Sequence, residues 1–254
     1  MTIANQRCVS AAYGTDLAFV HDVGFGDFAR AAAPFLVALL RRRGIGSARV
    51  VDLGSGSGIL AAALCRKGYH VLGIDLSASM IRLARRRAPR AVFRRDSFVS
   101  ARLPECEAVT ALGECLNYAF DSRVGRRTIP AFFRRVHRVL APRGVFVFDI
   151  ATPGRGAGPA IRYHAGDGWV VIAHMTEDAH RHVLTRRITA FRRVGRRWRR
   201  SDEVHRLRLY RRDDVRRWLE TAGFDVGVLH GYGRLRFPRG WLGFVASPRH
   251  SRRI

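Results

Sequence analysis

The most constraining feature of this 254-residue chain is a glycine-rich turn between an apolar run and a helix-forming run. Val50 and Val51 lead into Asp52-Leu53-Gly54-Ser55-Gly56-Ser57-Gly58, and the helix-forming run 59–66 follows. Glycine lets the backbone come close to a ligand where a Cβ would collide. A second apolar run ends in Asp75, about 20 residues on, where a carboxylate would bind ribose hydroxyls. The pattern therefore predicts a strand, a tight turn and a helix that bind a nucleoside-containing ligand.

The spacing of the glycines narrows the choice of nucleoside. Dinucleotide-binding turns read G-x-G-x-x-G, and the third glycine of that pattern is replaced here by Ile59. The sequence reads D-x-G-x-G-x-G, which resembles motif I of the class I S-adenosylmethionine (SAM)-dependent methyltransferases. A phosphate loop of the type G-x-x-x-x-G-K-[ST] is absent from the sequence.

Strands alternate with helices over most of the chain. Expected strands are 49–53, 69–75, 91–95, 108–112, 145–150, 225–230 and 241–246, and expected helices are 28–40, 57–67, 77–88, 128–140 and 212–221. This rhythm predicts an α/β, Rossmann-like, doubly wound sheet of seven mostly parallel strands with an antiparallel strand seven. Residues from about 160 to 210 break the rhythm, because runs of alternating polarity predict a small antiparallel β insertion there. In its last strand, Leu207 and Leu209 fall on one face, and Arg206 and Arg208 on the other.

The chain as a whole resembles a class I SAM-dependent methyltransferase of the small-molecule type (methyltransferase domain 11/25-like). The matching segments are 52–58, Gly73-Ile74-Asp75-Leu76-Ser77, Arg95-Asp96-Ser97-Phe98, 139–145 and 219–224. The insertion is loosely similar to that of bacterial sugar-amine N-methyltransferases. The expected organisation is an N-terminal helical lid segment, 1–44, and a methyltransferase domain, 45–254, that contains the insertion.

The resemblance implies that SAM is the cofactor and assigns residues to it. Asp52, Gly54, Ser55 and Gly56 would contact the methionine moiety, Asp75 the ribose, and Asp96 the adenine amino group. The remaining implied contacts are Tyr13, Leu76, Met80, Ser97, Phe98 and Leu112. Asp96 is also a common turn former or helix cap, and Phe98 and Met80 are also ordinary core residues.

The methyl acceptor implied by the resemblance is a small molecule with a nitrogen or oxygen nucleophile. Glu114, Tyr118 and His21 are the catalytic candidates, because the first two follow strand four at the ligand-binding edge of the sheet and His21 lies in the lid segment. Glu114 also has a plain interpretation as a partner of a helix dipole, and His21 as a surface side chain. Further pocket candidates, which the sequence does not rank, are Asn117, His164, His174, His230 and Tyr232.

A formal net charge of +26 keeps an alternative open, an RNA-directed methyltransferase. The arginines are spread along the chain, and the segment 112–115 lacks the proline-containing turn of base-amine methyltransferases. A third possibility is a catalytically silent SAM-binding protein. The four cysteines show no C-x-x-C spacing, so no metal is expected. We expect a cytoplasmic protein, monomeric or homodimeric, without a membrane partner.

Overall fold

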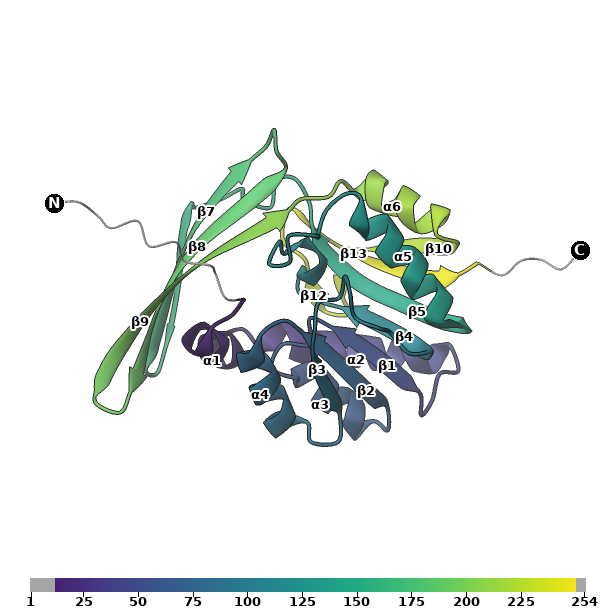
Figure 1. Ribbon diagram of the computed structural model, residues 1–254, viewed down its shortest axis with the longest axis horizontal. Coiled ribbons are helices and arrows are strands. Elements are labelled where there is room, and N and C mark those ends of the chain that lie inside the picture. Colours follow the sequence, from purple (N-terminus) through teal and green to yellow (C-terminus); the bar gives the residue numbers. More distant parts are fainter. Residues whose placement is uncertain (1–11, 250–254) are drawn as a thin grey trace, which may run out of the picture.

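The computed structural model describes residues 12–249, which form a large central sheet and a smaller antiparallel sheet beside it (Figure 1). The large sheet has seven strands in the order β10-β13-β5-β4-β1-β2-β3. They are β1 (Arg49–Leu53), β2 (His70–Asp75), β3 (Val92–Arg95), β4 (Cys106–Ala111), β5 (Leu140–Ala151), β10 (Phe224–Leu229) and β13 (Trp241–Pro248). Within this sheet, β13 is antiparallel to both of its neighbours, and β1 to β5 are mutually parallel. The predicted fold class is confirmed.

Helices cover both faces of the large sheet. One core lies against α2 (Asp27–Arg42), α3 (Ile59–Arg66) and α4 (Ala78–Arg87), and the other against α5 (Thr128–Val139) and α6 (Arg212–Thr221). The strand β1 is buried on both sides, since Val50 packs into the first core and Val51 into the second. This double burial explains why the adjacent residues Val50 and Val51 are both apolar, where a half-exposed strand would alternate.

The insertion is a four-stranded antiparallel sheet that projects to one side of the large sheet (Figure 1). Its strands are β6 (Ile161–Gly166), β7 (Trp169–Asp178), β8 (Val183–Val194) and β9 (Arg197–Arg208), in that order. The short helix α1 (Thr15–Gly24) packs on it through a small core that includes Leu17, Val20 and Trp169. The predicted insertion is therefore present. Its first strand, β6, is an exposed edge strand without a buried face.

One boundary differs from the sequence-based expectations by more than two residues, and one hairpin was not expected. Strand β5 begins at Leu140 rather than Val145, because Leu140 pairs with Cys106 and the segment 141–144 bulges out before pairing resumes at Val145. A short hairpin of β11 (Gly231–Tyr232) and β12 (Leu235–Arg236) precedes β13 and was not predicted. A single 3-10 turn, η1 (Cys115–Asn117), follows β4.

The N-terminal residues 1–11, which belong to the expected lid segment, lie outside the described residues. Between residues 12 and 249, no single helix is long and apolar enough to cross a membrane, although α1 and α2, bent by 60°, meet the length and composition criteria as a pair.

Candidate active site

The glycine-rich turn after β1 depends on glycine at several positions. Gly54, Gly56 and Gly58 have φ angles of 64°, 52° and 76°, in the left-handed region that favours glycine. A Cβ on Gly54 would lie 2.6 Å from the Cβ of Cys115. The Gly54 amide donates a hydrogen bond to the carbonyl of Ile74 (2.8 Å). The turn is thus held against β2 and leaves its outer side free for a ligand.

Two carboxylates flank this turn at the ends of β1 and β2. Asp52 accepts a hydrogen bond from the Thr110 hydroxyl (2.7 Å), and Asp75 accepts from the backbone amides of Gly56 (2.9 Å) and Ser77 (2.8 Å). Burial raises the pKa of Asp52 to about 7, against the hydrogen bond from Thr110, and the charge of Asp75 adds to the rise. Burial also raises the pKa of Asp75, against its two amide hydrogen bonds.

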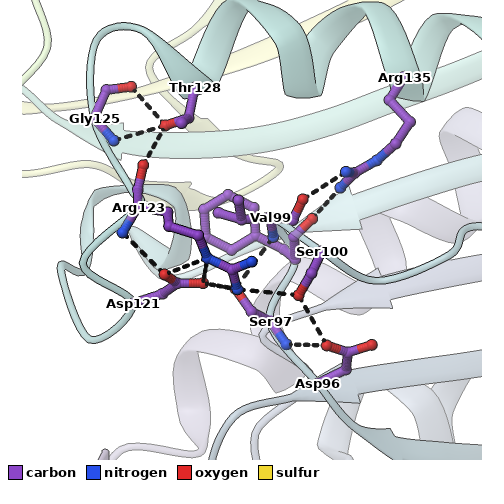
Figure 2. A network of polar contacts seen from close by, with 10 residues as sticks. Asp96, Ser97, Val99, Ser100, Asp121, Arg123, Gly125, Thr128 and Arg135 are labelled. Atoms are coloured by element: carbon purple, nitrogen blue, oxygen red, sulfur yellow. Dashed lines mark hydrogen bonds and ion pairs between the residues drawn. The ribbon is translucent and has the colours of Figure 1, made fainter.

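The third carboxylate, Asp96, lies beyond β3 at the edge of the same cavity. Figure 2 shows Asp96 accepting hydrogen bonds from the Ser97 amide (2.7 Å) and the Ser100 hydroxyl (3.1 Å). The Ser97 hydroxyl instead donates to Asp121 (2.6 Å). Arg135 donates to the carbonyl oxygens of Phe98 and Val99 and so fixes this loop from α5. Asp96 therefore has the turn-forming role considered for it and still borders the cavity.

A cavity of about 510 Å³ joins the carboxyl ends of β1, β2 and β4 to α1 and the insertion. Of the fifteen residues assigned from the sequence to SAM or to catalysis, fourteen line it. They are Tyr13, His21, Asp52, Gly54, Ser55, Gly56, Asp75, Leu76, Met80, Asp96, Phe98, Leu112, Glu114 and Tyr118. Ser97 does not, because its side chain is turned to Asp121. Within the described chain, no group of three or more His, Cys, Asp or Glu residues is arranged to hold a metal ion.

Glu114 is buried between two arginines. Its carboxylate accepts from Arg155 and from Arg186 (2.7 Å), and 3% of its side chain is exposed. Burial opposes ionisation, but the charges of Arg186 and Arg155 outweigh it and lower the pKa of Glu114. A carboxylate stabilised in this way is a weak proton acceptor. The loop that carries Glu114 is held by Asp149, whose carboxylate accepts a hydrogen bond from the Glu114 amide (2.6 Å).

Tyr118 and Tyr13 extend this polar chain into the cavity. Arg186 donates to the Tyr118 hydroxyl (3.0 Å), which lies 3.1 Å from the Tyr13 hydroxyl. Burial raises the pKa of Tyr13 well above its ordinary value, and the neighbouring Tyr118 adds to the rise. The Tyr13 hydroxyl is therefore suited to donating a hydrogen bond rather than to acting as a phenolate.

The histidines separate into two groups. His21 lines the cavity and packs edge-on against Tyr13, and burial lowers its pKa to about 4. His164 also lines the cavity, whereas His174 and His230 do not. The two other polar candidates have structural contacts instead. The Asn117 amide bonds the backbone of Ala151 and Arg208, and the Tyr232 hydroxyl bonds Asp149.

The structure adds His205, which was not proposed from the sequence. It is fully buried, lines the cavity, and its Nε2 lies 2.8 Å from the Glu203 carboxylate. A usable signal was present, since the period-two rule that puts Leu207 and Leu209 on the inner face of β9 puts His205 and Glu203 there too.

Comparison with known proteins agrees with this geometry. Residues 50–144 match the family model described as a methyltransferase domain. The chain is 28% identical over 237 residues to a dTDP-3-amino-3,6-dideoxy-alpha-D-glucopyranose N,N-dimethyltransferase of Streptomyces fradiae, across 87% of this chain and 88% of that protein.

Solved structures share the fold. A SAM-dependent methyltransferase from Clostridium acetobutylicum has a TM-score of 0.78 at 18% identity and covers 92% of this chain and 98% of its own. The sugar N-methyltransferase KedS8 from Streptoalloteichus has a TM-score of 0.77 at 21% identity, with 98% of each chain covered. The methyltransferase-domain match over residues 50–144 and the shared fold support a class I SAM-dependent methyltransferase, in agreement with the glycine turn and the carboxylates of the cavity.

Proposed function

We propose that this methyltransferase acts on a small molecule, with a nitrogen or oxygen as the methyl acceptor. The observation that carries the proposal is the single cavity that begins at the glycine turn and continues beneath α1 and the insertion. Its far wall is formed mainly by apolar and aromatic side chains, as is typical of sites that enclose a small ligand. The names of the sugar N-methyltransferase relatives support a small acceptor as well.

The residues at the near end fit SAM. The turn at Gly54 leaves no room for a side chain, and the Ser55 hydroxyl is buried without a hydrogen-bond partner in the described chain. We assign the methionine moiety to Asp52, Gly54, Ser55, Gly56 and, from the lid, Tyr13. When bound, SAM supplies an electrophilic methyl group on a sulfonium, so the protein has mainly to align the acceptor with it.

The nucleoside end is assigned to the next strands. Asp75 accepts two amide hydrogen bonds, and its oxygens have further lone pairs for the ribose hydroxyls. Leu76 and Met80 would line one face of the adenine, Phe98 and Leu112 would complete its pocket, and Asp96 would accept from its amino group. Ser97 would contribute through its position in this loop only, since its hydroxyl is already bonded.

The lid function is assigned to α1. This helix contacts β6, β7, β8 and β9 of the insertion as well as α4, and its Leu17, His21 and the adjoining Phe25 line the cavity. The following helix, α2, packs with α3 on the large sheet. Opening of α1 would therefore admit ligands without disturbing the sheet.

An RNA acceptor is less well supported. The arginine cluster 192–200 lies at the far end of the β8–β9 hairpin (Figure 1), and several of its members are paired with acids. These pairs are Arg192 and Arg199 with Asp16, Arg193 with Asp167, and Arg200 with Asp202.

Calorimetry tests the cofactor assignment. The wild type should bind SAM and not NAD, and Asp75→Asn should weaken SAM binding at least about tenfold, since a hydrogen bond to a charged acceptor contributes about 1.5–3 kcal/mol. Asp225→Asn, on the exposed side of β10, is the matched control and should bind as the wild type does. Unchanged SAM affinity in Asp75→Asn would refute the assignment of the ribose.

Labelled SAM tests the acceptor class. Incubation with a fractionated cell extract should label a small compound that survives ribonuclease treatment. Label found only in ribonuclease-sensitive material would overturn the small-molecule proposal in favour of RNA.

A further inference from the structure

The acceptor end of the cavity contains an oriented histidine. We propose that His205, held by Glu203, is the base that takes the proton from a hydroxyl acceptor, and that the body of this acceptor is flat and largely apolar. The inference rests on the proposed function, because it specifies the chemistry at the far end of the same cavity.

The hydrogen bonds of the pair determine which ring nitrogen is free. Glu203 accepts from the Gly14 amide through Oε1 (2.8 Å) and lies 2.8 Å from Nε2 of His205 through Oε2. A carboxylate accepts hydrogen bonds, so Nε2 carries the ring proton and Nδ1 keeps its lone pair. Within the described chain, Nδ1 is buried and has no hydrogen-bond partner. A buried polar atom without a partner is costly, and the hydroxyl of an acceptor admitted by opening of α1 would satisfy it.

The imidazole is fixed in place by aromatic rings. Its centroid lies 4.9 Å from that of Tyr13, 4.8 Å from Phe120 and 5.7 Å from Tyr118. These rings and Glu203 leave His205 little freedom to rotate. Nucleophile-activating histidines are oriented by a third group in this manner.

The share of the cavity wall that β7, β8 and α1 contribute is largely apolar, whereas β6 adds Arg162 and His164. The insertion contributes Val171, Ala173, Met175 and Ile188, and α1 and its C-terminal end contribute Leu17 and Phe25. A sugar ring buried against this wall would leave several hydroxyls without partners, whereas a flat apolar ring would not.

The buried charges near His205 are balanced. Arg155 and Arg186 pair with Glu114, and Glu203 adds a second carboxylate beside His205. A balanced site offers no free counter-charge to an ammonium acceptor, and a neutral hydroxyl acceptor needs none.

The reaction step balances with the residues present. The acceptor O–H gives its proton to Nδ1 of His205 while the oxygen forms a bond to the methyl carbon. The bond from that carbon to sulfur breaks, and the sulfur keeps the electron pair as a neutral thioether. Glu203 stabilises the imidazolium through Nε2–H, and the proton leaves to solvent after product release.

The test uses labelled SAM with two acceptor panels. One holds phenol, catechol, 4-methylphenol and 2-naphthol, and the other holds 3-amino-3-deoxyglucose and its dTDP ester. At least one phenol should yield an O-methyl product. His205→Gln should lower kcat for it at least about 100-fold, as loss of a general base does, with KM and SAM affinity little changed.

Two variants and one spectroscopic measurement complete the design. Glu203→Gln should lower kcat by a smaller factor, and His174→Gln, an exposed histidine of β7 that does not line the cavity, should keep the wild-type kcat. Nitrogen-15 NMR of the wild-type side chains should show the Nε2–H form of His205, which Glu203→Gln should disturb. This measurement needs no acceptor and no turnover.

The outcomes separate the two proposals. Failure to bind SAM would remove the proposed function itself. SAM binding with methylation of aminosugars alone, or of no compound in either panel, would overturn the hydroxyl acceptor and leave the small-molecule proposal standing. A phenol methylated equally well by His205→Gln, or an Nδ1–H form in the NMR spectrum, would overturn the role of His205.

Discussion

Replacing Glu114 with glutamine should destabilise the fold strongly. The side chains of Glu114, Arg155 and Arg186 are exposed by 3%, 10% and 14%, so solvent screens their charges little. In the described chain, both recorded ion pairs of these arginines are to Glu114. Glu114→Gln would leave two buried guanidinium groups without a counter-charge, and breaking a buried pair in this way costs about 3–5 kcal/mol.

The expected effect is large enough for a thermal shift assay. At about 2–4 °C per kcal/mol for a domain of this size, the loss corresponds to a Tm lower by roughly 6–20 °C. The double variant Glu114→Gln/Arg186→Met should recover part of the lost stability, because it removes one of the two buried charges that have no counter-charge. Asp27→Asn, which breaks an exposed pair with Arg30, is the control and should shift Tm far less.

The pH dependence of the effect has a definite sign. The pKa of Glu114 is lowered in the fold, so its contribution to stability is complete above the ordinary carboxyl pKa and is lost as pH falls through the folded value. The gap in Tm between wild type and Glu114→Gln should therefore stay constant near neutral pH and narrow in acid. A Tm within about 2 °C of the wild type, together with lost methyl transfer, would refute this reasoning and return Glu114 to the role of catalytic base.

Three further predictions concern the cofactor end and the surface. Burial raises the pKa of Asp52 to about 7, so the wild type loses stability as pH rises from the ordinary carboxyl pKa towards that value, and the loss is complete above it. Asp52→Asn should therefore gain about 2–3 kcal/mol relative to wild type between pH 5 and 8 in urea titrations, and a gain independent of pH would contradict this. Gly54→Ala places a Cβ 2.6 Å from that of Cys115 and should weaken SAM binding more than about tenfold in calorimetry, whereas Gly44→Ala, at a similar φ of 69° with open space around it, should not. In anisotropy titrations at physiological salt, the protein should not bind single-stranded RNA, and tight binding with a steep salt dependence would revive the RNA alternative.

The cofactor end was predictable because its determinants are local. Asp52, the glycines and Asp75 occupy one strand-turn-helix-strand unit, so their spacing in the sequence fixes their positions in the fold. Ser97 lines no cavity because its hydroxyl pairs with Asp121, 24 residues later in the chain. A pairing at that separation leaves no periodic trace in the sequence.

The acceptor end was predicted only in outline, because its contacts join residues that lie far apart in the sequence. Glu114 was proposed as a base, and it is neutralised by Arg155 and Arg186, which lie 41 and 72 residues away. His205 meets Tyr13 across most of the chain, through the docking of α1 onto the insertion. Alternation along β9 places His205 on the inner face, but that rule alone does not reveal what the inner face meets.

These contrasts indicate a division of labour within the cavity. The large sheet supplies the backbone turn and carboxylates at one end, and its geometry follows from parallel strand pairing. At the other end, α1 and the antiparallel insertion supply Tyr13, Arg186 and His205, whose positions follow from side-chain packing between the two elements. Packing tolerates substitution more readily than the backbone geometry of a left-handed glycine does. Substitutions that change the acceptor while keeping the cofactor should therefore be found in α1 and in β7 to β9 rather than in the turn after β1.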